Sequence, residues 1–393
     1  MKICHITPYF PYKEHINGKT VEKGYHVGGV ERHVYHVSRE LSELGHSVTI
    51  LTTKSPIHNN LTEVDLDINI LRVPIDLRIY TSCIPLLMFK CLHKIEYDVI
   101  HAHTPVPAVA DLAALQNIKQ KRPFILTYHN DIGKEGFFGG TIATIYNNTI
   151  GSFLLRHADV IIATSRSYAI NSVQLKKHLS KVKVIPNGVD LEIFHPRLDG
   201  KRLIIKHGVS KDSKIVLFVG KIDHYKGCDY LLRAFASVVK IFSQSHLIFV
   251  GSGSLEGKMK QMAIDLKITS NVTFLRNISD QDLPSCYAAC DVFALPSISF
   301  HEGFGMVQLE AMACGKPVVT TSIPGVKEVD ADGVATIHVP PKNEKALESA
   351  IIRILQDEKL RRRMCRNARK KAEGYSWRRV AMEIENVYKK VMT

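Results

Sequence analysis

The stretch "SFHEGFGMVQLEAMACGKPVVTT", residues 299–321, carries two glutamates, Glu302 and Glu310, on either side of a Gly-Phe-Gly turn. The apolar residues after the turn recur at helical spacing and end at a glycine, which is typical of a helix C-terminus. Strand-like runs precede and follow this helix, at 292–295 and 318–320. Strand, helix and strand in this order predict one parallel unit of an α/β sheet. Glu302 is then expected at the start of the helix, near the sheet edge where such folds bind ligands.

Short apolar runs alternate with longer helical patterns along almost the whole chain. The expected strands are Lys2–Thr7, Ser47–Thr53, Val99–Ala102, Phe124–Thr127, Val160–Ala163, Val182–Ile185, Ile215–Val219, Leu247–Val250, Val272–Leu275, Val292–Leu295 and Val318–Thr320. Helical patterns lie between most of them, for example Gly29–Leu44 and Tyr230–Ile241. Such alternation predicts parallel sheets with helices on both faces.

The length of 393 residues is too great for one ordinary core and favours two domains. The stretch "VIPNGVDLEIFHPRLDG", residues 184–200, is rich in Pro, Asn and Gly and is typical of a linker. We therefore predict two doubly wound domains with a boundary near residue 195. Because ligands bind outside the carboxyl ends of parallel strands, one ligand site is expected in a cleft between the two domains.

Composition places the chain among globular proteins, with 45% apolar and 23% charged residues. No apolar run approaches the roughly 20 residues that span a bilayer, and the first residues lack a signal-peptide pattern, so a cytoplasmic location is expected. Eight cysteines without a CxxC pair indicate reduced thiols. The formal net charge of +14 attracts phosphate groups. Aromatic residues are not interleaved with the basic ones, so nucleic acid is not the expected partner.

Three glycine- or lysine-rich stretches suit phosphate binding. Gly28 and Gly29 precede a predicted helix, whose positive N-terminus attracts phosphates, although a tight loop would look the same. Lys221 follows a strand and Lys226 precedes the next helix, as two cations for a diphosphate would, although solvated lysines are common. The segment "GSGSLEG", residues 251–257, has the spacing GxGxxxG and is not the dinucleotide fingerprint.

Two histidines, His103 and His129, end predicted strands, where the sites of α/β sheets form. His129 is the better candidate for a functional residue, with a simple loop cap as the alternative. His101 alternates with His103 along one strand, but no third ligand is evident, so a metal site is not expected. Asp-x-Asp pairs, which hold metal in one class of sugar transferases, occur at Asp65/Asp67 and Asp330/Asp332 in turn-like or polar contexts, and we predict no obligatory metal.

The two glutamates of the opening stretch suit a hydroxylated ligand. A carboxylate accepts hydrogen bonds from neighbouring hydroxyls, so Glu302 and Glu310 can hold two sugar rings. Backbone N–H groups at the helix start, residues 303–306, can donate hydrogen bonds to phosphate oxygens. With Lys221 and Lys226 against a diphosphate, these features predict a nucleotide-diphosphate sugar site.

The chain resembles the retaining glycosyltransferases of the GT-B fold, the large family that includes bacterial mannosyl- and glucosyltransferases. The resemblance covers nearly the whole chain. It rests on Gly-Gly-Val-Glu at 28–31, "ADVIIATS" at 158–165, "VIPNGVD" at 184–190, the "GK…KG" segment, and "EGFGMVQLEAMACGKPVV" with its complete E-x7-E pattern. It implies an acceptor-binding Rossmann-like domain over residues 1–195, a nucleotide-sugar domain over 196–375, and a last helix, 376–393, that crosses back to the first domain.

The resemblance also implies roles for the candidate residues. Glu302 would bind donor-sugar hydroxyls, Glu310 the ribose, and Lys226 and Lys221 the diphosphate leaving group. His129 would lie over the donor sugar and help to stabilise positive charge at the anomeric carbon. Backbone donors to sugar and phosphate would come from Gly303, Phe304, Gly305, Met306 and Val307, with Gly28 and Gly29 against the phosphates and the acceptor.

The implied reaction moves a hexose of mannose or glucose type from a GDP- or UDP-linked donor to a hydroxyl, with retained configuration and without metal or other cofactor. Glu302 is expected to face hydroxyls, so no carboxylate presents itself as a nucleophile, and a same-face substitution is expected. The family usually has arginine where this chain has Lys221, whose compact ammonium does not replace arginine's planar fork in kind.

The acceptor is expected to be a glycan, a lipid-linked glycan or a lipid. The segment 78–94 mixes basic and apolar residues at helical spacing and suits an anionic membrane surface, although a core-facing helix fits equally. The protein would then be peripheral on the cytoplasmic face. Two alternatives are an NAD-dependent dehydrogenase-like protein and a non-catalytic GT-B protein that only binds nucleotide sugars.

Overall fold

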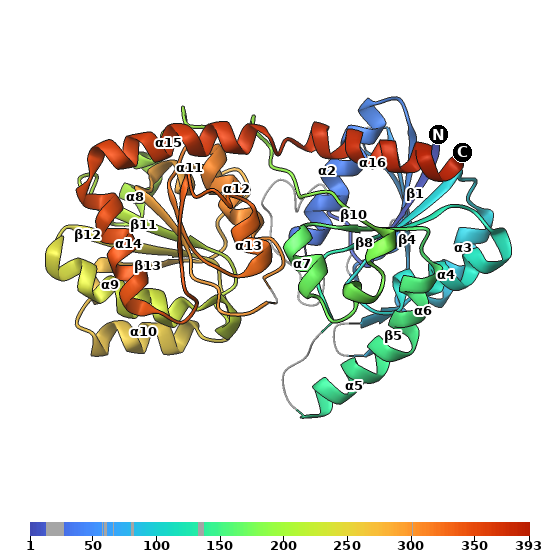
Figure 1. Cartoon of the computed structure of the whole chain (residues 1–393), viewed down its shortest axis with the longest axis horizontal. Coiled ribbons are helices and arrows are strands. Elements are labelled where there is room, and N and C mark those ends of the chain that lie inside the picture. Colours follow the sequence, from blue (N-terminus) through green and yellow to red (C-terminus); the bar gives the residue numbers. More distant parts are fainter. Residues whose placement is uncertain are drawn as a thin grey trace. The chain divides into compact units, whose positions relative to one another are not determined.

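The computed structural model describes residues 1–12, 27–56, 58, 61–65, 67–79, 82–132, 137–300 and 302–393. These residues form two compact units (Figure 1). The first comprises the described residues up to Asn187 together with Trp377–Thr393, and the second comprises Gly188–Ser376. The chain passes from one unit to the other between Asn187 and Gly188, inside the linker-like stretch, rather than after residue 195.

The first unit is built on an eight-stranded sheet in the order β10-β9-β8-β7-β1-β2-β4-β3, with only β3 antiparallel to its neighbour. Its strands are β1 (Lys2–Ile6), β2 (Ser47–Thr53), β3 (Thr62–Asp65), β4 (Ile68–Val73), β7 (Val99–His103), β8 (Phe124–Tyr128), β9 (Val160–Ala163) and β10 (Val182–Val184). A separate two-stranded sheet joins β5 (Leu77–Ile79) and β6 (Ser82–Ile84). Strand order reverses between β1 and β7, and such switch points are where open sheets bind ligands.

Seven helices belong to the described part of the first unit: α2 (Gly29–Glu43), α3 (Leu86–Lys94), α4 (Val109–Gln120), α5 (Phe137–Asn148), α6 (Ile150–His157), α7 (Arg166–Asn171) and α16 (Trp377–Met392). The last of these confirms the prediction that the C-terminal helix returns to the first domain, because α16 packs against α2 (Figure 1). Its buried residues recur at helical spacing from Trp377 to Tyr388.

The second unit is a six-stranded parallel sheet in the order β13-β12-β11-β14-β15-β16. Its strands are β11 (Lys214–Val219), β12 (Ser245–Val250), β13 (Val272–Leu275), β14 (Val292–Leu295), β15 (Val318–Thr321) and β16 (Thr336–Val339). Its helices are α8 (Lys201–Lys206), α9 (Cys228–Ile241), α10 (Glu256–Asp265), α11 (Leu283–Ala289), α12 (Met306–Ala313), α13 (Pro324–Glu328), α14 (Glu344–Gln356) and α15 (Glu358–Glu373). Here the order reverses between β11 and β14.

Both faces of the second sheet are covered, which explains why its strands are nearly all apolar. Leu217 belongs to the core under α8, α11 and α12, whereas the next residue, Phe218, belongs to the opposite core under α9 and α14. A strand buried on both sides loses the alternation of a half-exposed one and becomes a continuous apolar run. The predicted doubly wound architecture is confirmed in each unit. All eight cysteines are free, as expected.

Two local predictions are wrong. The segment 78–94, expected to be one helix, contains the β5–β6 sheet before α3 begins at Leu86, and residues 80–81 lie outside the described ranges. The helix after the Gly-Phe-Gly turn begins at Met306 rather than near Phe304, because Gly305 takes a left-handed conformation at its N-cap. Among the described residues, no helix combines the length and apolarity needed to cross a bilayer.

Candidate functional site

Lys226 and Glu302 meet at the point where the second sheet reverses its strand order. Lys226 ends a short 3-10 helix that follows β11, and Glu302 lies in the loop after β14. Since β11 and β14 are hydrogen-bonded neighbours and parallel, both loops leave the same edge of the sheet. The topology therefore brings together two residues that are 76 positions apart in the chain.

The two side chains form a buried ion pair. The Lys226 ammonium donates a hydrogen bond to Glu302 Oε2, and each residue is only 8% exposed. The Ser297 hydroxyl donates to the same carboxylate oxygen at 3.0 Å. Burial disfavours the charge on Lys226, but attraction to Glu302 outweighs it, and the pKa of Lys226 is raised. A cation and a carboxylate are thus held, charged and shielded from water, at the sheet edge.

Glu310 is fixed by a residue that the sequence did not indicate. The Tyr287 hydroxyl, from α11, donates a hydrogen bond of 2.6 Å to Glu310 Oε2. Tyr287 is fully buried and Glu310 is 8% exposed. This contact orients the Glu310 carboxylate. No sequence signal identifies Tyr287, because it lies in an apolar helical run like any core tyrosine.

The backbone between the two glutamates enters α12 through a tight turn. Gly305 has φ of 74°, and a Cβ there would lie 2.7 Å from Leu295 Cδ2, so both conformation and space require glycine. Phe304 is buried, whereas Gly303, Met306 and Val307 are partly exposed. The first N–H groups of any helix lack partners within the helix. The first N–H groups of α12 can therefore donate hydrogen bonds to an anionic ligand.

Lys221 takes a different place from the one expected. Its ammonium lies 2.7 Å from Asp223 Oδ2, and its side chain is 66% exposed. Asp223 in turn accepts hydrogen bonds from the Ser254 backbone and hydroxyl, at 3.1 and 2.6 Å. The structure therefore groups Lys221 with Asp223 and groups Lys226 with Glu302.

Packing explains the first two glycines of the GxGxxxG segment, whereas a Cβ on Gly257 would meet no atom within 4 Å. A Cβ on Gly251 would lie 2.1 Å from the Gly220 carbonyl oxygen, and one on Gly253 would lie 2.3 Å from that of Ile222. These glycines let the loop after β12 press against the loop that carries Lys221. Their spacing thus has a structural cause that needs no dinucleotide.

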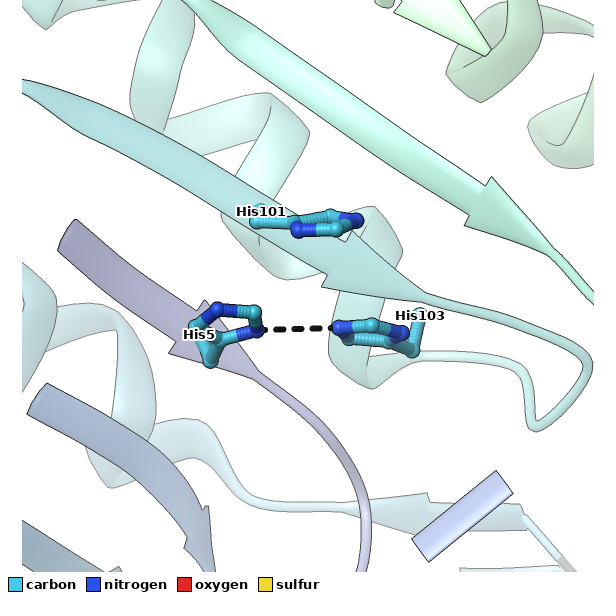
Figure 2. A group of neighbouring side chains, drawn as sticks. All are labelled: His5, His101 and His103. Atoms are coloured by element: carbon cyan, nitrogen blue, oxygen red, sulfur yellow. Dashed lines mark hydrogen bonds between the residues drawn. The ribbon is translucent and has the colours of Figure 1, made fainter. Parts of the chain in front are cut away.

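The first unit places histidines at its own switch point (Figure 2). His5 lies on β1, and His101 and His103 lie on the adjacent β7. His5 Nδ1 is 3.1 Å from His103 Nε2. His101 is held by the Thr127 hydroxyl and by the Tyr388 hydroxyl, each at 2.6 Å. All three rings are fully buried.

His129 joins this cluster from the end of β8. Its Nε2 is 3.5 Å from His103 Nδ1, and the centroid of its ring is 4.9 Å from that of His33. His33 Nδ1 is fixed by Asn187 Oδ1 at 2.8 Å. His129 is 8% exposed. The imidazoles of His103 and His33 therefore position the His129 ring. Of the histidines in this cluster, the sequence indicated only His101 and His103 as neighbours.

The expectation that no third histidine accompanies His101 and His103 is wrong. Their ring nitrogens and that of His5 lie within 4.8 Å of one another, as do those of His33, His103 and His129. Imidazole nitrogens are ligands that zinc prefers. Yet the ring nitrogens of His5, His101 and His103 already take part in the hydrogen bonds described above, so a metal would have to replace those contacts. In the second triad, His33 Nε2 has no hydrogen-bond partner among the described residues. His5, His101 and His103 form a network of neutral imidazoles.

Acidification is expected to destabilise the protein through this cluster. Burial lowers the pKa of His5 to about 3 and of His33 to about 4, and it lowers those of His101, His103 and His129 well below the usual range. In the unfolded chain histidine titrates near pH 6.5. Below that pH the unfolded state binds protons that the native state refuses, so the free energy of unfolding falls as pH drops from about 6.5 toward 4, by at most about 1.4 kcal/mol per pH unit for each histidine.

Glu31 opposes this trend, since burial raises its pKa to about 7 and its protonation favours the folded state at lower pH. Glu40 and Asp111, whose pKa values burial also raises, act in the same direction as Glu31. Three carboxyls against five histidines leave the net sign unchanged. Thermal unfolding followed by circular dichroism from about pH 7 to about pH 5 should show a falling midpoint. His5→Gln should flatten the dependence, and the exposed His207, changed to Gln, should not. A midpoint that rises on acidification would contradict the neutral network.

Gly28 is the N-cap of α2 and Gly29 is its first residue, at the surface of the first unit. The Gly28 N–H donates to Glu31 Oε2 at 2.8 Å, and both glycines are exposed. Gly28 has φ of −125°, which any residue adopts. Its backbone conformation therefore does not require glycine, and close approach of a ligand remains the reason to expect glycine there.

One of the two aspartate pairs, Asp330 and Asp332, is engaged by a lysine. Lys371 lies 3.4 Å from Asp330 Oδ1 and 2.7 Å from Asp332 Oδ1. Asp330 also accepts the Ala335 N–H at 2.9 Å. This pair therefore ties a turn to α15. Asp65 ends β3, and Asp67 lies beyond the undescribed residue 66.

Comparison with known families divides the chain as the fold does. Residues 27–193 match the family described as Glycosyltransferase Family 4. Residues 200–371 match Glycosyl transferases group 1.

Relatives match along nearly their full length. The chain is 30% identical to an uncharacterized glycosyltransferase of Methanocaldococcus jannaschii, over 93% of this chain and 95% of that protein. It is 29% identical to a phosphatidyl-myo-inositol mannosyltransferase of Mycolicibacterium smegmatis, over 93% and 90%.

Solved structures share the fold. Sucrose-phosphate synthase from Thermosynechococcus elongatus superposes with a TM-score of 0.79 at 23% identity, covering 99% of this chain and 98% of that one. Anabaena HepE in complex with UDP-glucose gives 0.77 at 20% identity, covering 99% and 100%.

Proposed function

Because the chain belongs to the GT-B glycosyltransferases with family 4 and group 1 domains, we propose that it transfers a hexose from a nucleotide-diphosphate sugar to a hydroxyl group with retained configuration. The donor is GDP- or UDP-linked, and the hexose is of mannose or glucose type. Relatives named as phosphatidyl-myo-inositol mannosyltransferases and a structural neighbour solved with UDP-glucose support this choice. The acceptor is a glycan, a lipid-linked glycan or a lipid.

The buried Lys226–Glu302 pair is the observation that carries the proposal. A simple structural ion pair inside a protein is often no better than packed apolar residues, so a buried pair at a sheet's switch point suggests a functional reason. A hydroxyl of the donor sugar would donate a hydrogen bond to the Glu302 carboxylate, and the Lys226 ammonium would donate to the diphosphate. Glu310, oriented by Tyr287, would accept the ribose hydroxyls.

The proposed chemistry depends on stabilising the leaving group. The bond between the anomeric carbon and the donor phosphate breaks, the acceptor oxygen bonds to that carbon on the same face, and the departing phosphate oxygen takes the acceptor's proton. Lys226 and the first N–H groups of α12 would neutralise the charge that develops on the phosphate. Lys221 would add a second cation. His129 would act on the donor sugar, and Gly28 and Gly29 would contact the phosphates and the acceptor. No metal takes part in this scheme.

A thermal-shift titration with UDP, GDP, ADP and CMP tests the nucleotide site, with and without EDTA. One diphosphate should stabilise the protein, by about 2.7 kcal/mol when its concentration is a hundredfold above Kd, and EDTA should not change the shift. Loss of the shift in EDTA would overturn metal independence. No shift with any nucleotide would overturn the site itself. Binding without release of nucleotide from any sugar donor would favour a protein that only binds.

A further inference from the structure

An apolar groove of about 720 Å³ opens on the first unit, away from the histidine cluster. It lies between the β5–β6 sheet, helix α4 and the junction of α5 with α6, which neighbour one another in Figure 1. Its walls include Ile79, Ile84, Leu115, Ile150 and Phe153. Three of these remain about half exposed: Ile79 at 48%, Leu115 at 47% and Ile150 at 49%. Single exposed aliphatics are ordinary, but a contiguous apolar hollow on a protein surface marks a binding site.

The polar groups that border the groove are satisfied by the protein itself. The Tyr146 hydroxyl donates to Asp111 at 2.9 Å, and Asp111 also accepts the Ala108 N–H at 2.8 Å. The Thr149 hydroxyl donates to the Ile145 carbonyl at 2.7 Å. An extended peptide bound here would leave its backbone N–H and C=O groups without partners, which is costly. A hydrocarbon chain carries no such groups and fits the chemistry of the walls.

A second hollow, of about 460 Å³, lies farther along helix α4, between α4 and α3, and its mainly apolar walls are bordered by lysines. Its lining includes three exposed lysines, Lys90 and Lys94 from α3 and Lys119 from α4. Helix α4 contributes Leu115 to the apolar groove and Lys119 to the second hollow, one turn apart on the same face of the helix. An apolar groove and a cluster of cations that follow each other along one helix are complementary to a molecule that has a hydrocarbon chain and an anionic head.

We propose that this groove binds one acyl chain of an anionic phospholipid, with Lys90, Lys94 and Lys119 facing its phosphate group. The lipid would seat the first unit on a membrane. The inference rests on the proposed function for its purpose, the presentation of a membrane-bound acceptor, but binding requires neither donor nor acceptor. Failure of the lipid site would therefore leave the transfer reaction standing, and failure of the nucleotide titration would leave the lipid site standing.

Flotation of the full chain with phosphatidylcholine vesicles, with and without phosphatidylglycerol, tests the proposal. The wild type should float with vesicles that contain phosphatidylglycerol. Leu115→Asp and Ile150→Asp should weaken this binding roughly ten- to hundredfold, because each removes a buried aliphatic contact with the chain. The matched control is Ile170→Asp on α7, an isoleucine of the same unit with the same 49% exposure, and it should float like the wild type.

A phosphatidylglycerol with a photoreactive group near the end of one chain locates the contact directly. Cross-linked peptides should come from α4 and α6, and the joint Lys90, Lys94 and Lys119 to alanine variant should lose preference for the anionic vesicles. If the triple lysine variant lost flotation while Leu115→Asp and Ile150→Asp floated like the wild type, the groove would not be a lipid site. Membrane binding would then rest on electrostatic attraction at the surface alone. No flotation of the wild type and no cross-linking would overturn the proposal altogether. So would a shift from dimer to monomer in Leu115→Asp with normal flotation, because the groove would then be an interface between copies.

Discussion

Replacing Lys226 with alanine should slow turnover by about 10²–10³-fold, the usual cost of losing one charged group that stabilises a developing anion. The ammonium is buried and held against Glu302, so it is ordered before any donor arrives. A preorganised cation loses no free energy to reorganisation when the phosphate departs. The loss should appear in kcat more than in KM, because the charge on the leaving oxygen is largest in the transition state. Release of nucleotide from the donor measures it even before the acceptor is known.

A stability control accompanies this variant, since removing one partner of a buried ion pair costs about 3–5 kcal/mol. Thermal unfolding of Lys226→Ala separates lost folding from lost chemistry at the assay temperature. Lys226→Arg keeps the charge and should recover part of the rate, while Lys240→Ala, at an exposed site on α9, should change neither. Turnover near that of the wild type in a folded Lys226→Ala would remove the leaving-group role and weaken the proposed function.

Most of the strands that the sequence predicted correctly are buried along their length, although β10 and β13 are only partly buried. The run from Ile215 to Val219 is apolar throughout because α8 and α9 cover opposite sides of β11. Strand β4 was missed because it is not such a run. It includes Asn69, and its Arg72 is fully buried, with the guanidinium bonded to the carbonyls of Phe10 and Pro11. A buried arginine of this kind depends on tertiary contacts that no periodicity reveals.

The local sequence pattern correctly placed the site residues in loops and at helix starts. It did not indicate which of their side chains contact each other. Lys221 and Lys226 look alike in sequence, yet one faces Asp223 at the surface and the other is buried with Glu302. The fold makes this distinction, because the Tyr225 carbonyl accepts the Ile298 N–H at 2.8 Å and so joins the Lys226 end of one loop to the loop that carries Glu302. His5 was overlooked for the same reason, since 98 residues separate it from His103 and only the adjacency of β1 and β7 joins them.

Replacing Glu310 with alanine should weaken binding of the stabilising nucleotide by about 10–100-fold. Hydrogen bonds to a charged group contribute about 1.5–3 kcal/mol each, and the ribose would lose its acceptor. Isothermal titration calorimetry with the free nucleotide isolates this step from chemistry. The affinity of Glu310→Gln for the nucleotide should lie between those of the wild type and of Glu310→Ala, because an amide keeps one acceptor oxygen but not the charge.

Tyr287→Phe distinguishes the ligand contact from the support behind it. This variant keeps the Glu310 carboxylate and removes the 2.6 Å hydrogen bond that orients one of its oxygens. Affinity should drop by less than about tenfold, the equivalent of a net contribution near 1 kcal/mol from one such bond. Normal binding in Glu310→Ala would show that the ribose is held elsewhere. A loss in Tyr287→Phe equal to that in Glu310→Ala would mean that orientation, and not the carboxylate alone, sets the affinity, because a mobile carboxylate must be ordered again each time a nucleotide binds.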